Sequence, residues 1–225
     1  MQKLFGTLIE LTLNLNLNLN LNLNLNLNLN LPTMKKTFAI LFLISTILLS
    51  CKHKDNNADL FLKDIKNYSE AYNKKDWGKV TSIIYPKLFD FMSKQEMINL
   101  LNLVDSMGLN IHLNYDKIDS VSEVAVSGNE QFCVFYYSGI LKLIITNDLL
   151  LSSLDPLQAQ NEQAYGKGNV KWDEKEKTFT INAHQAMIAV AGKDSANWKY
   201  IEYKKENQDL MPKLLPEEVR SRLKL

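Results

Sequence analysis

The chain has 225 residues, of which 46% are hydrophobic and 23% are charged, and its formal net charge is +1. This length and composition suit one domain of ordinary size with a real hydrophobic core. From residue 52 onward, 23 Lys and Arg face 24 Asp and Glu. Such a balance gives no strong field toward nucleic acid, so we expect no nucleic-acid partner.

A repeated dipeptide dominates the beginning of the chain, where Leu and Asn alternate without a break from Leu13 to Leu31. Strict alternation is the period of a strand, and such a segment could be an adhesive, aggregation-prone tract. However, a repeat of one dipeptide carries no information from which to build a specific core. We therefore interpret residues 1–33 as a low-complexity segment outside the true protein. Translation is expected to start at Met34, since a secretory signal belongs at the N-terminus.

The next segment, Met34 to Cys51, reads MKKTFAILFLISTILLSC. Two lysines, a short apolar run and a small residue before the last position are typical of a secretory signal, and the run is too short to span a bilayer comfortably. Its last four residues, LLSC, resemble the lipobox of bacterial lipoproteins, whose cysteine is lipidated. The resemblance implies a signal peptide over 34–50 and a lipid on Cys51. It also implies a place in the cell envelope, on the periplasmic or surface face of the outer membrane.

The mature chain then divides into a polar tether over 51–58, which includes the lipidated cysteine, and a single domain over 59–225. If Cys51 carries lipid, Cys133 has no partner within the chain and no disulfide can form. Cys133 lies in an apolar run, FCVFYY. It is interpreted as a small buried hydrophobic residue, with a reactive thiol as the alternative.

Three helices are predicted at the start of the domain. The predicted N-caps are Asp59, Asp76 and Ser93. Glu96 completes a capping box with Ser93, and Pro86 and Gly108 end the second and third helices. The apolar stripes, in order, are Phe61, Ile65, Tyr68 and Tyr72; Trp77, Val80, Ile83 and Ile84; and Met97, Leu100, Leu101, Val104 and Met107. We expect the third stripe to be buried, and the apolar connector 88–92 to close one end of the core.

After Gly108 the apolar pattern changes to the period of a strand. Strands are predicted over 111–115, 131–146, 170–172, 178–191 and 198–203. Residues 121–126 either continue the first of these strands or begin another. A short helix is predicted over 156–165, and a terminal helix is expected to begin at Pro216. This order indicates an α+β fold in which N-terminal helices pack on a curved antiparallel sheet.

Two short stretches carry a family resemblance: Tyr68 with YNKKDW (72–77) in the passage between helices, and WKYI (198–201) in the last strand. With the order of elements, they resemble the NTF2-like, cystatin-like α+β roll over residues 59–204. The chain departs from that family by lacking an early hairpin between the second and third helices and by an insert at 147–177. The resemblance implies a cavity between the helices and the concave sheet.

The sequence lacks the motifs that would identify a cofactor or a reaction. The sequence contains no phosphate-binding glycine loop in a strand–helix context, and no HExxH, CxxC, calcium-loop or GxSxG pattern. Its three histidines are too far apart to form a local metal cluster. We therefore expect no cofactor and no metal.

One enzymatic hypothesis remains, because some NTF2-like families use an Asp or His inside the cavity as a general base. The candidates implied by this resemblance are His112, Asp116 and His184. The alternative is that these residues form the solvent-exposed side of half-buried strands, opposite Leu113 and Tyr115.

Aromatic residues crowd the predicted sheet, and a pocket for an apolar ligand could be lined by Phe135, Tyr137, Trp198 and Tyr200. The alternative is that they simply fill the core. Taken together, the sequence predicts a lipid-anchored envelope protein that binds a small apolar ligand or another envelope protein. The alternative function is an NTF2-like cavity enzyme of the isomerase or dehydratase type.

Overall fold

The computed structural model describes residues 56–204 and 209–225. The Leu-Asn repeat, the signal-like segment and Cys51 lie outside these ranges, as does the tether up to residue 55. No helix in the described ranges is long and apolar enough to span a bilayer.

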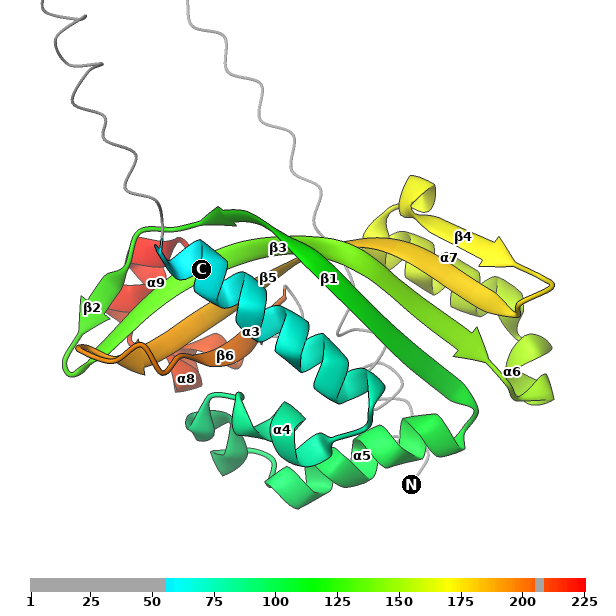
Figure 1. Cartoon of the computed structure of the whole chain (residues 1–225), viewed down its shortest axis with the longest axis horizontal. Helices are drawn as coiled ribbons and strands as arrows, with labels where there is room; N and C mark the ends of the chain where they lie inside the picture. The colour runs from blue at the N-terminus through cyan, green and yellow to red at the C-terminus, as the bar shows by residue number, and fades with distance from the viewer. Residues whose placement is uncertain (1–55, 205–208) are drawn as a thin grey trace, which may run out of the picture. The chain divides into compact units, whose positions relative to one another are not determined.

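The predicted α+β fold is confirmed: helices come first and an open antiparallel sheet follows (Figure 1). The N-terminal helices are α3 (Asn56–Asn73), α4 (Trp77–Ser82), the 3-10 helix η1 (Pro86–Asp90) and α5 (Lys94–Ser106). The strands are β1 (Leu109–Val121), β2 (Ala125–Ser127), β3 (Glu130–Ile145), β4 (Val170–Asp173), β5 (Thr178–Gly192) and β6 (Lys199–Tyr203). The remaining helices are α6 (Asp148–Leu151), α7 (Leu154–Tyr165), η2 (Lys167–Asn169), α8 (Met211–Leu214) and α9 (Glu217–Leu223).

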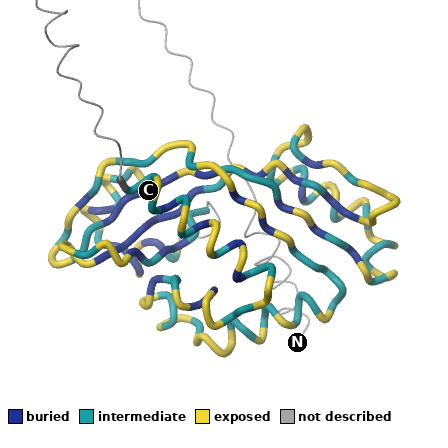
Figure 2. The backbone as a smooth tube through the Cα atoms, in the orientation of Figure 1, coloured by how far each residue is buried: buried dark blue, intermediate teal, exposed yellow. Residues whose placement is uncertain are grey.

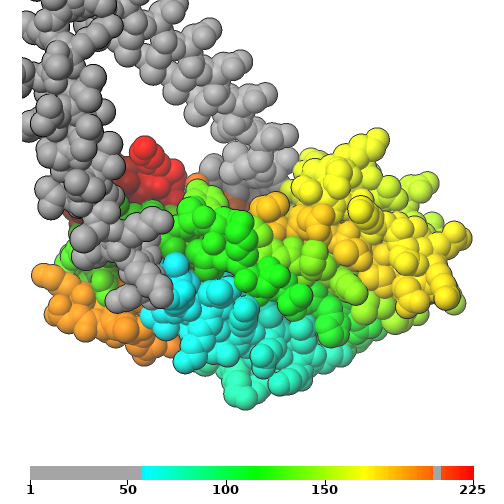
Figure 3. Space-filling model, turned by 45° about the horizontal axis from the view of Figure 1, so that its top comes forward, coloured from blue at the N-terminus to red at the C-terminus, as the bar shows by residue number. Residues whose placement is uncertain are grey.

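The six strands of the described residues form one sheet, in which β1, β3, β5 and β4 follow one another. In addition, β2 pairs with β3 and β6 pairs with β5. The long central strands β3 and β5 pair from Glu130 opposite Gly192 to Ile144 opposite Thr178. β1 therefore lies at one edge of the sheet, where Figure 3 shows its green surface beside the cyan surface of α3.

Both faces of the sheet are covered, and a separate core lies on each. On one face, called the α3 face here, Phe61 and Ile65 of α3 pack against residues such as Phe135 and Leu141. On the other, called the α9 face, Val219 of α9 packs among residues of β3, β5 and α8. Successive side chains of a strand point to opposite faces, and both faces are covered here. The run FCVFYY is therefore buried without a break from Phe132 to Phe135, and Figure 2 shows such buried stretches in dark blue.

The predicted helix starts hold where a local side chain fixes them. Asp76 accepts from the Lys79 amide at 3.1 Å and caps α4. In the capping box, the Glu96 amide lies 3.2 Å from the Ser93 hydroxyl, and the Ser93 amide donates to the Glu96 carboxylate at 2.8 Å. α3, in contrast, is already helical at Asn56, the first described residue, three residues before the predicted cap.

Two burial predictions are wrong. None of the residues of α5, all of which are described, is fully buried, although its stripe was expected to be. α5 lies beside α4 and the beginning of β1 rather than under the sheet, so only part of its apolar face is covered (Figure 1). The connector 88–92 does not close the core either, because Phe91 is 50% exposed.

The strand region differs from the prediction in three places. β1 continues past Tyr115 to Val121, with irregular pairing after Tyr115 and after Ile118, and a separate strand, β2, begins at Ala125, so that residues 121–126 divide between the two alternatives. α7 begins at Leu154, two residues before the predicted start. The helices α6 and α8 were not predicted, because four residues give too little periodicity to detect.

Gly139 lies opposite Tyr115, where β1 becomes irregular. A Cβ atom at this position would lie 2.2 Å from the Asn114 carbonyl oxygen and 2.6 Å from the Tyr115 Cα. Both are backbone atoms, so they cannot move aside as a flexible side chain would. The absence of a side chain at Gly139 therefore permits the close approach of β1 to β3.

Candidate functional site

The three acid–base candidates are all exposed on the surface of the sheet. His112 and Asp116 alternate with the buried Leu113 and Tyr115 along β1, and His184 in β5 follows the buried Ala183. This arrangement is the one expected for the solvent-exposed side of half-buried strands. None of the three lies in an enclosed cavity of the described residues.

His184 does have polar neighbours, which lie across the strands from it. Ser138 is paired with His184 in β5, and its hydroxyl donates to the Asp119 carboxylate. The Nδ1 atom of His184 lies 2.9 Å from the Ser138 Oγ and 3.8 Å from Asp119. Partial burial raises the pKa of Asp119, but hydrogen bonds from Lys117 and Ser138 outweigh this and hold the pKa below its usual value.

This cluster does not have the geometry of a Ser-His-Asp triad. In a triad the imidazole lies between the serine and the carboxylate and accepts the serine proton. Here Ser138 lies between the other two and gives its single proton to Asp119. The His184 side chain is also 69% exposed, so water competes for every bond it makes. The cluster is therefore a hydrogen-bonded surface group.

The four aromatic residues predicted to line a pocket are buried core residues. Phe135, Tyr137, Trp198 and Tyr200 are between 0% and 5% exposed. Phe61 of α3 stacks on Phe135 with ring centroids 4.6 Å apart and meets Trp198 edge-on at 5.4 Å. These rings join α3 to the sheet, which is the alternative role given to them above.

A second buried set on the α3 face is polar. The Tyr137 hydroxyl donates to Gln185 Oε1 at 2.8 Å, and Lys204 pairs with Glu202 at 2.6 Å with only 9% of the lysine side chain exposed. Burial, with smaller contributions from Glu202 and neighbouring tyrosines, raises the pKa of Tyr115 and Tyr137 well above the usual value. Both hydroxyls therefore stay neutral, and the Tyr137 hydroxyl serves as a hydrogen-bond donor inside the fold.

Cys133 also lies on this face and is fully buried. Burial raises the pKa of its thiol to about 12. The thiolate is the reactive form, so a neutral buried thiol behaves as a small hydrophobic residue.

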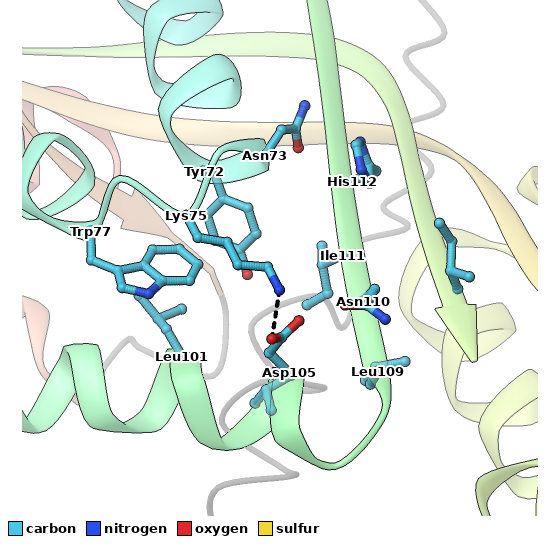
Figure 4. Close-up of a pocket in the computed structure, with 12 residues that line it drawn as sticks. Tyr72, Asn73, Lys75, Trp77, Leu101, Asp105, Leu109, Asn110, Ile111 and His112 are labelled. Atoms are coloured by element: carbon cyan, nitrogen blue, oxygen red, sulfur yellow. Dashed lines mark hydrogen bonds and ion pairs between the residues drawn. The ribbon is translucent and has the colours of Figure 1, made fainter. Parts of the chain in front are cut away.

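A pocket of about 200 Å³ opens elsewhere, where the end of α3, the turn to α4, α5 and the beginning of β1 meet (Figure 4). Its walls include the aromatic rings of Tyr72 and Trp77, which meet edge-on with centroids 5.4 Å apart. Its apolar lining residues are Leu101, Val104, Leu109, Ile111 and Ile144. Lys75 and Asp105 add one charge of each sign, and His112 is the acid–base candidate that lines it.

Asn73, the last residue of α3, fixes the wall formed by that helix. Its side-chain amide donates to the Leu113 carbonyl at 2.8 Å and accepts from the Leu113 amide at 2.9 Å. The side chain thus acts as a short strand partner at the edge of β1. This contact ties the end of α3 to β1 at one wall of the pocket.

Lys75, in the turn after α3, has a φ of +56°. The Lys75 amide donates to the Tyr72 carbonyl and the Asp76 amide to the Ala71 carbonyl, both at 2.9 Å. These two bonds form a Schellman motif, in which the residue with positive φ is usually glycine. A lysine there costs about 1–2 kcal/mol of backbone strain.

The side chain of Lys75 crosses to α5 and pairs with Asp105, with 2.6 Å between Nζ and Oδ2 (Figure 4). The two side chains are 51% and 34% exposed. An ion pair this exposed contributes only about 0–1 kcal/mol, less than the strain at the Lys75 backbone. Stability alone therefore does not account for a lysine at this position.

Two further features make the pocket rigid and chemically defined. The Trp77 indole donates to Asn102 of α5 at 2.8 Å, which fixes the ring plane. Burial, followed by the charges of Glu202 and Asp105, raises the pKa of Tyr72 to about 12. Tyr72 is therefore a neutral wall residue at physiological pH. The pocket combines an apolar surface, two aromatic rings and a partly exposed ion pair, which suits binding of a small organic molecule.

The comparisons with known proteins bring no further residue to this site. No protein family model matches the chain, and no curated protein matches it in sequence. Among the described residues, no group of three or more His, Cys, Asp or Glu is placed to hold a metal ion.

Sequence patterns missed most of the pocket. Lys75 and Asp105 are thirty residues apart, and so no local periodicity relates them. The stretch YNKKDW is a passage between helices, and its position just before the capped start of α4 was the available signal. Leu101 and Val104 were identified as apolar positions of a helix, but they were assigned to the core rather than to a pocket.

Proposed function

We propose that this protein is a lipid-anchored binding protein of the cell envelope. It binds a small organic molecule in the pocket between α3, α5 and β1, and its anchor is the lipid on Cys51. The observation that carries the binding function is the pocket itself, with Tyr72 and Trp77 as walls over an apolar surface. The envelope location rests on the signal-like segment 34–50 and the lipobox-like LLSC.

The size of the pocket limits the ligand. At about 200 Å³ it lies below the range of about 300–1,000 Å³ that is usual for drug-sized ligands. It therefore holds one ring or a short chain, but not the body of a lipid. Binding is favoured over the cavity-enzyme alternative because His112, Asp116 and His184 are all exposed to solvent.

The binding function is tested by screening single-ring and short-chain compounds against the full-length protein in detergent with ligand-detected NMR. Leu101→Trp places a large ring in the pocket and is expected to abolish binding of every hit. His184→Gln, on the α9 face, is the control and should leave affinities unchanged. Hits that bind Leu101→Trp as tightly as the wild type would show that the pocket is not the site.

The anchor is tested separately by intact-mass measurement of protein extracted from membranes. We expect a lipid adduct on a chain that lacks residues 1–50. Cys51→Ala should leave the membrane fraction or remain uncleaved. Recovery of Leu-Asn repeat peptides from cells would contradict a start at Met34.

A further inference from the structure

Lys75, Lys177 and Lys224 all have a positive φ, a conformation that suits glycine, and Lys75 is the one of these three lysines that lines the pocket. Its ion pair with Asp105 does not offset the strain. Backbone strain that stability does not explain is a mark of functional positions. What the lysine provides and glycine does not is an ammonium group. Figure 4 shows this group reaching across the pocket to Asp105, between Tyr72 and α5.

We propose that the pocket binds a small organic anion, whose carboxylate pairs with the Lys75 ammonium while its apolar body contacts Leu101 and Ile111. This inference rests on the proposed binding function and specifies its ligand class. Asp105 holds the ammonium at the pocket when no ligand is bound. A ligand carboxylate can share the Lys75 ammonium with Asp105 or take its place. The Lys75–Asp105 pair is weak, because the two side chains are 51% and 34% exposed.

The lining carries one charge of each sign, Lys75 and Asp105, and the strain at Lys75 is what favours an anion over a cation. A cationic ligand would have to remove Lys75 from Asp105, and the strained backbone would then present an ammonium with no role in binding. An anion uses both the strained lysine and the apolar surface. Tyr72 adds a neutral hydroxyl, because its pKa is raised and it brings no negative charge to repel a carboxylate.

The experiment uses three probes with the same ring and different charge: benzoate, benzamide and benzylamine. Each is titrated into full-length protein in detergent, and binding is followed through the NMR signal of the Trp77 indole N–H, assigned with Trp77→Phe. For ligands this small we expect a benzoate Kd on the order of 1 mM. Benzamide and benzylamine should each bind at least about 5-fold more weakly, because they lack the charge-assisted bond.

Two variants remove the ammonium in different ways. Lys75→Gly suits the positive φ and Lys75→Met keeps the length of the side chain, so a loss shared by both is not a folding effect. Each should weaken benzoate binding about 10-fold and leave benzamide unchanged. The matched control is Lys74→Met, which removes the same charge from an exposed neighbour paired with Glu70 at 3.6 Å. Asp105→Asn removes the competing carboxylate and should tighten benzoate binding about 2–5-fold.

The outcomes separate this inference from the proposed function. If benzylamine binds most tightly and Asp105→Asn abolishes its binding, the pocket is a cation site and the inference is overturned while the binding function stands. Equal affinities for the three probes, unchanged in both Lys75 variants, also overturn it. If no probe shifts the Trp77 signal at tens of millimolar, the pocket is not a ligand site and both proposals fail.

Discussion

Replacing Asn73 by Ala tests how the chain holds the end of α3 against the sheet. The Asn73 side chain makes two hydrogen bonds, at 2.8 and 2.9 Å, to the backbone of Leu113, forty residues away. β1 is at the edge of the sheet order, so these backbone groups point away from β3. Without the Asn73 side chain, the backbone N–H and C=O groups of Leu113 can form hydrogen bonds only with water.

The expected cost follows from these contacts. Two hydrogen bonds at about 0.5–1.5 kcal/mol each give about 2 kcal/mol, and solvent at the sheet edge replaces part of what is lost. Ala is also the better helix former by up to about 0.5 kcal/mol. We therefore expect Asn73→Ala to lower the free energy of unfolding by about 1.5 kcal/mol.

Urea unfolding measures this difference, and Asn67→Ala is the matched control. Asn67 is an exposed residue of the same helix, so the same substitution should be neutral or slightly stabilising. A second measurement is hydrogen exchange, in which the Leu113 amide should lose protection selectively in Asn73→Ala. If the two variants unfold within about 0.5 kcal/mol of each other and the exchange of Leu113 is unchanged, Asn73 does not hold β1, and our account of the pocket wall is wrong.

Three further predictions follow from the packing and the caps. Ser93→Ala should lower the free energy of unfolding by about 1 kcal/mol at pH 7. Hydrogen bonds from Ser93 lower the pKa of Glu96 below its ordinary 4.5, so the contribution of Glu96 to stability should be full above pH 4.5 and lost as the pH falls through the lowered pKa. Urea unfolding of Glu96→Gln and of the wild type over this pH range checks the prediction. Leu101→Ala should lower the free energy of unfolding by only about 1 kcal/mol, because Leu101 is partly exposed, whereas Phe61→Ala removes a fully buried stacked ring and should lower it by about 3–5 kcal/mol. Equal losses of unfolding free energy in chemical denaturation would contradict the burial pattern. Gly139→Ala should destabilise by about 3 kcal/mol or more, since its Cβ would meet backbone 2.2 Å away, and a thermal melt unchanged from wild type would refute the close approach.

The sequence predicted those parts of the fold that depend on neighbours in the chain. The capping box of Ser93 and Glu96 is a local exchange of hydrogen bonds, so four residues were enough to identify it. The alternation around Leu113 likewise predicted which side of β1 is buried. Helix stripes gave the orientation of α5 but not its depth, because burial depends on what packs opposite.

The candidate site was much less predictable. Lys75 and Asp105 meet only because α3 ends where α5 passes, a fact of the tertiary arrangement. The strain at Lys75 is a backbone angle, which no residue type reveals when the position holds a lysine instead of the usual glycine. His112 was identified from its strand position, and it does line the pocket, but as an exposed side chain rather than as a buried base.

Asn56, the first described residue, is already helical, and its position has a consequence for how far the domain can reach. If Cys51 carries the proposed lipid, five peptide steps join it to Asn56 of α3 and span at most about 18 Å. The domain is then held against the membrane surface and explores only a thin layer of the surrounding compartment. Molecules released at or confined to that membrane meet it at a high effective concentration. A protein anchored outside this layer has to extend into the layer to contact the domain.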